Sequence, residues 1–187
     1  VQQARGVVGL LRQQTLQAMM DWSYELLDEA ERTLLRRLSV FGGGFTLEAV
    51  EAICLDPEDA STPTLAATAA DLAPSILNLV SQLIDKSLVN VEQGAGTPRY
   101  RMLETVRQYG REKLVTAGEA ARFRQRHRDW CLSLAEVAAR EMQGPVQVTW
   151  INRIAAEHDN LRAALGWSLG GDAPADGARL AGALWWF

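Results

Sequence analysis

Apolar residues recur every three or four positions along most of this chain, which is the spacing of a helix that buries one face. The glycine pairs and the Gly144-Pro145 step between these segments are typical of helix ends. A stretch rich in Ala, Thr, Asp and Pro, residues 56–73, is expected to be a loop. The pattern therefore predicts helices over 15–27, 47–54, 75–86, 103–117, 119–142, 147–169 and 177–187. A further helix is expected to start at Asp28, run through Leu38 and break at Gly42–Gly44.

Several helix ends carry capping signals. Asp28 followed by Glu31 has the form of a capping box, and Thr46 is a good N-cap. Pro74 suits the first turn of a helix, and Gly118 lies where a C-cap is expected. The apolar face expected for the first helix consists of Leu16, Met19, Met20, Tyr24 and Leu27.

One segment departs from the helical pattern. Residues 87–92 and 99–103 have the composition of strands, and the glycine-rich residues 93–98 between them are typical of a turn. A single hairpin among helices favours a winged helix. The predicted fold class is mainly α, a winged helix-turn-helix with one β-hairpin followed by antiparallel helical repeats, although no strict 34-residue self-similarity is found.

Composition narrows the class of protein. The chain has 187 residues, 48% of them hydrophobic, a mean hydropathy of −0.09 and no run of 18 apolar residues. The start at Val1 lacks the features of a signal peptide. Cys54 and Cys131 form no C-x-x-C pair, and both are expected to be buried, so a reducing cytoplasm is predicted. The missing methionine and the apolar end at Phe187 suggest a fragment.

Six segments together resemble the bacterial STAND-type ATPase regulators, related to NB-ARC proteins and often linked to LuxR-like or SARP-like DNA-binding domains. The resemblance implies a linker at 1–14, a winged helix at 15–117 and the start of tetratricopeptide-like repeats at 118–187. It also implies that ADP or ATP binds to an upstream domain that carries the family's phosphate-binding loop. No G-x-x-x-x-G-K-[ST] motif occurs in this chain, so the chain itself is not expected to hydrolyse ATP. The segments are 12–16, 21–27, 38–46, 83–89, 100–109 and 156–165.

The same resemblance implies nucleotide-facing residues. Met102-Leu103-Glu104 falls where related switches carry Met-His-Asp, whose histidine contacts the phosphates of ADP. Leu103 cannot donate a hydrogen bond, so another group, such as Arg99, Arg101 or Arg107, would have to hold the phosphate. The alternative is that Met102 and Leu103 are core residues.

Charge argues against DNA recognition by this segment. Residues 12–117 contain ten basic and fifteen acidic side chains, a net charge of −5, whereas DNA affinity comes mainly from neutralised phosphates. The helix in the recognition position has no arginine to pair with guanine. Its polar groups are Asn78, Ser81, Gln82, Asp85 and Lys86.

Other clusters have two interpretations each. Arg122, Arg124, Arg126 and Arg128 form either a docking surface, in which Arg122 and Arg126 would join Arg99 and Arg101, or a solvated helix face. The six tryptophans either line a ligand groove or join helix pairs, which is the more common role. His158 has no second histidine or cysteine nearby, so no metal site is predicted, and residues 157–160 are interpreted as a packing or turn feature.

The sequence therefore predicts a non-catalytic regulatory module without a cofactor of its own. The winged helix would pack on an upstream nucleotide-binding domain and couple its ADP or ATP state to helices that bind an effector or partner protein. One alternative is a DNA-binding winged-helix transcription factor, and another is a protein-binding helical scaffold. No direct DNA or membrane contact is expected for this segment.

Overall fold

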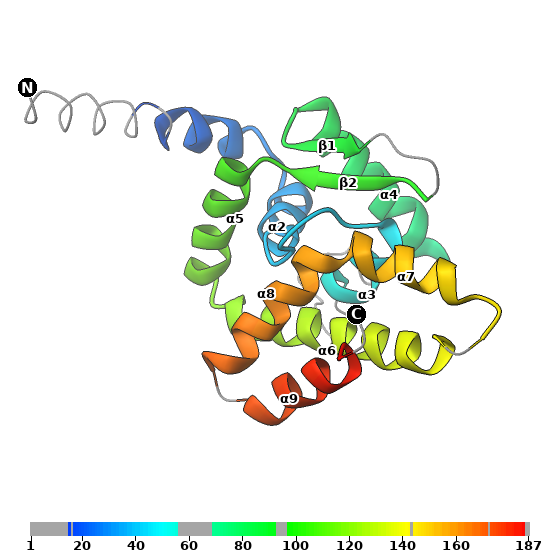
Figure 1. The fold of residues 1–187 in the computed structure, drawn as a ribbon. Helices are drawn as coiled ribbons and strands as arrows, with labels where there is room; N and C mark the ends of the chain where they lie inside the picture. The colour runs from blue at the N-terminus through cyan, green and yellow to red at the C-terminus, as the bar shows by residue number, and fades with distance from the viewer. Residues whose placement is uncertain are drawn as a thin grey trace, which may run out of the picture.

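The computed structural model describes residues 15, 17–55, 69–92, 97–142, 144–171 and 173–185. These residues are mainly helical, with one small antiparallel hairpin (Figure 1). Among them, no helix is both long enough and apolar enough to cross a bilayer. After a helical segment at 17–25, the elements are α2 Glu29–Leu38, α3 Leu47–Cys54, α4 Ala69–Asp85, β1 Val89–Glu92, β2 Arg99–Met102, α5 Glu104–Thr116, α6 Ala120–Glu141, α7 Gln147–Ala156, α8 His158–Leu169 and α9 Pro174–Ala183.

The hairpin predicted from the sequence is present, and with it the predicted fold class is confirmed. β1 pairs antiparallel with β2, so that Val89 lies opposite Met102, and both side chains are buried. Phe45 forms an isolated antiparallel bridge with Tyr100, through two backbone hydrogen bonds of 2.8 Å. Three helices, α2 to α4, therefore precede a minimal sheet with a wing, and the predicted turn residues 93–96 lie outside the described residues.

Local capping chemistry explains several helix ends. Asp28 accepts the Glu31 N–H and Glu31 accepts the Asp28 N–H, each at 2.8 Å, so the predicted capping box is confirmed. The Thr46 hydroxyl accepts the Ala49 N–H at 3.2 Å. Gly118 follows α5 with a φ of +72°, a left-handed conformation that glycine adopts without a Cβ penalty.

The structure corrects four boundaries. Residues 69–73 belong to α4 and not to a loop, because their alanines and leucine are good helix formers, and Pro74 lies inside that helix instead of in its first turn. The single helix expected at 147–169 is two helices, α7 and α8, which separate at Glu157. The last helix spans 174–183 because Pro174 occupies its first turn.

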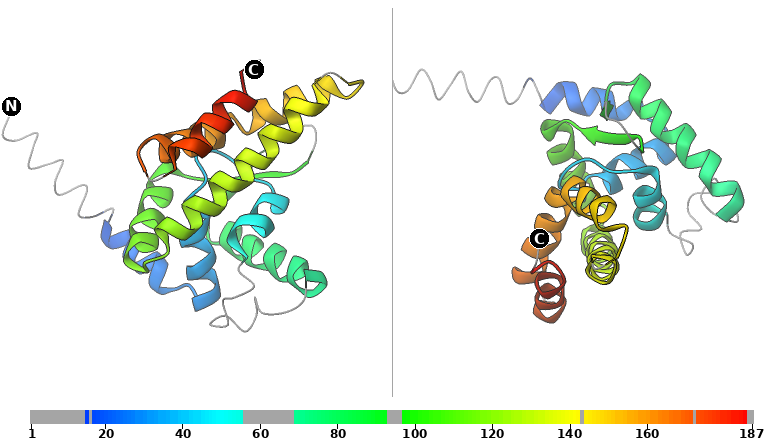
Figure 2. Two further views of the ribbon diagram at one scale, coloured as in Figure 1. Left: turned by 90° about the horizontal axis from the view of Figure 1, so that it is seen from below. Right: turned by 45° about the vertical axis from the view of Figure 1, so that its right-hand side comes forward.

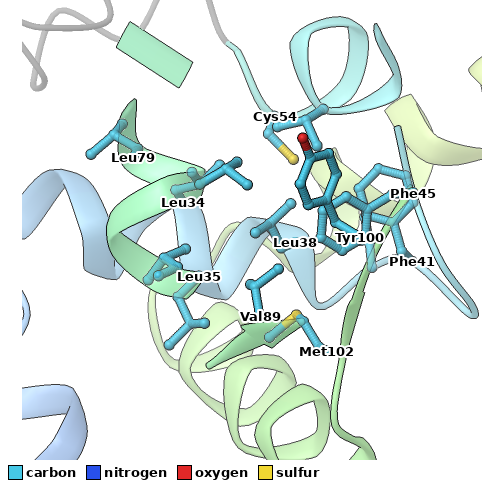
Figure 3. Close-up of a cluster of buried hydrophobic side chains, with 14 of the residues drawn as sticks. Leu34, Leu35, Leu38, Phe41, Phe45, Cys54, Leu79, Val89, Tyr100 and Met102 are labelled. Carbon is cyan, nitrogen blue, oxygen red and sulfur yellow. The ribbon is translucent and has the colours of Figure 1, made fainter. Parts of the chain in front are cut away.

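A first apolar core lies between α2, α3, α4 and the hairpin. Figure 3 shows Leu38 of α2 close to Val89 of the hairpin, with Leu34 and Leu35 in the same cluster. The stacked rings of Phe41 and Phe45 lie 4.9 Å apart, with Tyr100 beyond Phe45. Burial of these side chains is the main favourable term holding the helices onto the hairpin.

A second apolar core lies between α6, α7, α8 and α9, and α6 connects the two. Phe123, near the start of α6, belongs to the first core, whereas Cys131 and Ala135 belong to the second. Trp130 is partly buried against both cores. Figure 2 shows α6 running along the interface between the helices of the first core and the pair α8 and α9.

Candidate functional site

The exposed face of α4 is the surface that a helix-turn-helix fold would present to DNA. It carries Leu77, which is 45% exposed, and the polar side chains Asn78, Ser81 and Gln82. Its cation is Lys86, just beyond the helix end, and the Lys86 ammonium lies 2.5 Å from the buried carboxylate of Glu31. The positive charge at this edge is therefore already neutralised by the capping box of α2.

The basic residues of the wing are also paired. The Arg101 guanidinium donates to Glu92 on the neighbouring strand. Arg99 donates to Glu157 at 2.5 Å and to the carbonyl oxygens of Gly44 and Ala156 at 2.9 Å each. The predicted interaction residues Arg99 and Arg101 thus hold the wing to its own strand and to the turn between α7 and α8.

Asn160, at the start of α8, holds the loop that follows α2. Its side-chain oxygen accepts the N–H groups of Gly42 at 2.8 Å and Gly43 at 3.2 Å, and its nitrogen donates to the Gly44 carbonyl at 2.8 Å. The same nitrogen donates to Glu157 at 2.5 Å. We call Arg99, Glu157 and Asn160 the clamp, and Gly42–Gly44 the triglycine loop.

The triglycine loop needs glycine because the start of α8 approaches it closely. A Cβ on Gly42 would lie 2.4 Å from the carbonyl oxygen of Asp159, and one on Gly43 would lie 2.9 Å from the Asp159 Cβ. Arg107 of α5 donates to the carbonyl oxygens of Phe41 and Gly42, at 3.1 and 2.8 Å. The prediction of a packing feature at 157–160 is confirmed, but its partner loop was not visible from the sequence.

A second joint connects α2 and α3 to α6. The buried Arg37 guanidinium donates to Glu119 at 2.7 Å and to the Cys54 carbonyl at 3.1 Å, and it lies over the Phe123 ring at 4.4 Å. Arg126 of α6 donates to carbonyl oxygens at the end of α3, Leu55 among them at 2.5 Å. These arginines satisfy carbonyls that the helix end leaves without partners.

The basic cluster of α6 is not a plain solvated face. Arg122 is exposed, but Arg126 reaches α3, and the Arg124 guanidinium lies 4.0 Å from the ring centroid of Trp167 on α8. Arg128 pairs with Asp129 at 2.9 Å and with Asp176 of α9 at 3.2 Å. Most of this cluster therefore joins α6 to its neighbours.

Met102, Leu103 and Glu104 have three different environments. Met102 is buried in the first core, so the core interpretation holds for it. Leu103 is 54% exposed at the N-cap of α5, so that interpretation is wrong for Leu103, whose side chain faces solvent because the strand ends there. Glu104 is exposed and pairs with Arg107 one turn later in α5. Leu103 is thus available to contact another protein surface.

An apolar stripe is exposed on the helical segment at 17–25 and on Leu26, which follows it. Met19, Trp22 and Leu26, which lie three and four positions apart, are each at least 60% exposed. The expectation that Met19 faces the core is wrong, because only the opposite side of this segment, with Met20 and Tyr24, packs on the first core. Trp22 and Trp185 are exposed, so a core role fails for these two tryptophans.

Three buried titratable groups, His127, Cys54 and Cys131, are uncharged at neutral pH. Burial lowers the pKa of His127 to about 4, the charge of Arg111 acts in the same direction, and the Asn160 amide opposes them. Burial raises the pKa of Cys54 to about 12 and raises that of the Cys131 thiol as well. Neutral histidine and protonated thiols at neutral pH fit structural roles. The described residues contain no cluster of side chains able to hold a metal ion.

The three helices α2 to α4, the isolated bridge at Phe45 and the β1–β2 hairpin have the order found in a known family. Residues 27–115 match the winged helix-turn-helix domain. The match begins just before α2 and ends within α5, so it contains the triglycine loop, α4 and the wing. The matched range contains all of the buried residues of the first core except Phe123, whereas α6 to α9 lie beyond the match.

Curated relatives extend over more of the chain. Proteins of Mycobacterium tuberculosis and Mycobacterium bovis, each named "Putative HTH-type transcriptional regulator", are 44% identical over 167 residues, 88% of this chain. An uncharacterized Mycobacterium tuberculosis protein is 40% identical over 116 residues, 62% of this chain. The chain spans 17% of the length of the first relatives and 27% of the last. No solved structure gives a significant match.

Proposed function

We propose that this chain is a regulatory segment of a transcriptional regulator, in which the winged helix-turn-helix domain contacts protein surfaces instead of reading DNA. The observation that carries the proposal is the pairing of Lys86, Arg99 and Arg101. Each of these cations, which lie on α4 and the wing, contacts a carboxylate of the chain itself. Residues 69–75 and 93–96 contain no Lys or Arg.

The pairing matters because phosphate contacts supply most non-specific DNA affinity. To contact a phosphate, Lys86 would have to leave Glu31, whose carboxylate is 2% exposed and would remain buried and unpaired. Arg99 would have to leave Glu157, which is 3% exposed. Each exchange takes the counter-ion from a buried carboxylate, so little net affinity remains for the duplex.

A protein-contacting role fits the surfaces that remain open. Leu103 and the stripe of Met19, Trp22 and Leu26 expose apolar groups, and such exposed apolar groups are typical of interaction sites. An upstream nucleotide-binding domain is the partner that the family resemblance implies. The clamp would then carry a movement of the winged helix-turn-helix domain to α6 through α9 as one body.

Direct DNA binding is the second candidate, and the comparisons favour it. The family match and the names of the relatives speak of helix-turn-helix transcription regulation and not of a nucleotide-binding core. The matched relatives are much longer than this chain, so a DNA-reading surface elsewhere in such a protein satisfies their names equally well. The pairing of Lys86, Arg99 and Arg101 with carboxylates of the chain supports the first candidate, because DNA binding would need these cations to contact phosphates.

A salt titration with duplex DNA tests the choice. A labelled 30-base-pair duplex is mixed with wild type, Lys86→Gln and Arg101→Gln, and anisotropy is followed from low to physiological salt. Wild type is expected to show no saturable binding at ~10 µM protein, within the usual range of non-specific affinities. Saturable binding that both variants weaken, with a shallower salt slope, would establish the DNA-binding candidate instead.

Nucleotide exchange tests the coupling. In a longer chain that includes the upstream domain, ADP and ATP exchange is compared between wild type and Leu103→His. Slower ADP release in the variant would place Leu103 beside the phosphates, as expected for a switch. Unchanged exchange in a folded variant, together with partner binding by α6 to α9 alone, would support the scaffold alternative.

A further inference from the structure

A groove lies between α6, α8 and the start of α9, on the side of the second core. Its volume is about 690 Å³, within the range of small-molecule sites. Among the described residues that line it, two are arginines and none is acidic. The lining residues are Ala121, Arg124, Gln125, Arg128, Gly166, Trp167, Gly170, Gly171 and Ala173.

Among the described residues, Arg124 is the charged group of the groove that has no counter-ion. Its guanidinium lies 4.0 Å from the Trp167 ring centroid, and within the described part of the chain it has no carboxylate partner. Arg128, one turn along α6, pairs with Asp129 and Asp176. A planar guanidinium held against an aromatic ring keeps its donors oriented for a carboxylate or phosphate.

Gly166 leaves one wall of the groove without a side chain. It lies inside α8, where glycine costs about 1 kcal/mol relative to alanine. Packing does not require that glycine, because a Cβ there would meet no atom within 4 Å. The glycine at 177, by contrast, is needed, since its Cβ would lie 2.8 Å from the Cβ of Ser168. Gly166 therefore weakens the helix and keeps the groove open.

The groove also contacts the winged helix-turn-helix domain. The Arg111 guanidinium of α5 lies 6.0 Å from the Trp167 ring and donates to the Ser39 carbonyl, at the end of α2, at 3.0 Å. The buried indole nitrogen of Trp167 has no acceptor within the described residues. A group that binds against Trp167 would thus act one contact away from the end of α2.

We propose that this groove binds a small carboxylate- or phosphate-bearing molecule, with Arg124 on the anionic group and Trp167 beside its apolar part. The size of the groove, the unpaired Arg124 and the open wall at Gly166 carry the proposal. It does not depend on whether the winged helix-turn-helix domain contacts protein or DNA.

Benzoate and inorganic phosphate are suitable probes, with benzamide as the neutral counterpart of benzoate. The readout is the indole N–H signal of Trp167 in a ¹⁵N spectrum, assigned with Trp167→Phe. Saturable shifts with benzoate or phosphate, and none with benzamide, are expected for wild type. Saturation by only one of the two anions would identify which of them the groove prefers.

Three variants make the test specific. Arg124→Gln is expected to weaken anion binding at least ~10-fold, because the charge-assisted bond is lost. Gly166→Leu is expected to abolish binding by filling the groove while the melting temperature is kept or raised. Arg122→Gln, on an exposed position of α6 outside the lining, should bind like wild type. Absent saturation in wild type, or equal binding by Arg124→Gln, would overturn the proposal.

Discussion

The side-chain oxygen of Asn160 accepts the backbone N–H of Gly42 at 2.8 Å across 118 positions of sequence. The bond joins the start of α8 to the loop after α2, and Asn160 is 1% exposed. The winged helix-turn-helix domain and the helices after it are therefore held together by a buried polar contact and not only by apolar packing.

Asn160→Ala is expected to destabilise the chain by about 2–4 kcal/mol, since it leaves the N–H groups of Gly42 and Gly43 without an acceptor and removes one of the two side chains that donate to the Glu157 carboxylate. Urea denaturation measures the change. Asn152→Ala, at an exposed position on α7, is the matched control and should be close to neutral. Equal stabilities of the two variants would contradict the clamp.

Gly42→Ala should destabilise by more than ~1 kcal/mol, because its Cβ would meet the Asp159 carbonyl oxygen at 2.4 Å, and backbone cannot move aside cheaply. Gly182→Ala is expected to change the stability in the opposite direction. That position lies in α9 with nothing within 4 Å, so alanine should stabilise by about 0.5–1 kcal/mol. Thermal melting of the two variants checks both signs.

Arg37→Ala is expected to cost about 3–5 kcal/mol, as for other buried ion pairs from which one partner is removed. Glu119, the Cys54 carbonyl and the Phe123 ring all lose the guanidinium. Arg140→Ala, which removes an exposed arginine near the end of α6, serves as the control. A loss below ~1 kcal/mol for Arg37→Ala would show that the joint is dispensable.

His127 predicts a dependence of stability on pH. Its pKa is about 4 in the fold, lowered mainly by burial, against 6.5 for the free side chain. The unfolded chain therefore binds more protons between these values, so stability is lost as the pH falls from about 6.5 to 4, by about 3 kcal/mol at most. Above pH 7 this contribution is constant.

Denaturation at several pH values compares wild type with His127→Met, a substitution of similar volume. The variant should lack most of the slope between pH 6.5 and 5. His158→Asn, which removes an exposed histidine, should keep it. An unchanged slope in His127→Met would mean that other groups, and not this imidazole, carry the dependence.

Local chemistry was readable from the sequence wherever a few neighbouring residues decide the outcome. The capping box of Asp28 and Glu31, the Thr46 cap and the glycine at 118 act over three or four positions. The hairpin was likewise marked by local composition, two strand-like segments on either side of a glycine-rich turn. Hence the helices around the first core and the wing could be predicted, and the apparent loop at 69–73 failed because alanine-rich composition fits helices as well.

Contacts between distant segments were not readable. The break at Glu157 follows from its carboxylate binding Arg99 and Asn160, since the 147–169 pattern alone continues as one helix. The exposure of Leu103 depends on where β2 ends against the core. The pairing of Lys86 with Glu31 joins two helices 55 positions apart, and it changes the interpretation of the α4 face.

Because α6 contributes residues to both cores, it can transmit a rotation from one core to the other. Its 22 residues span about 33 Å at the helical rise of 1.5 Å per residue. Phe123 near one end turns with the winged helix-turn-helix domain, and Ala138 near the other turns with α9. A small rotation at one core therefore becomes a displacement at the other, without any hinge in between.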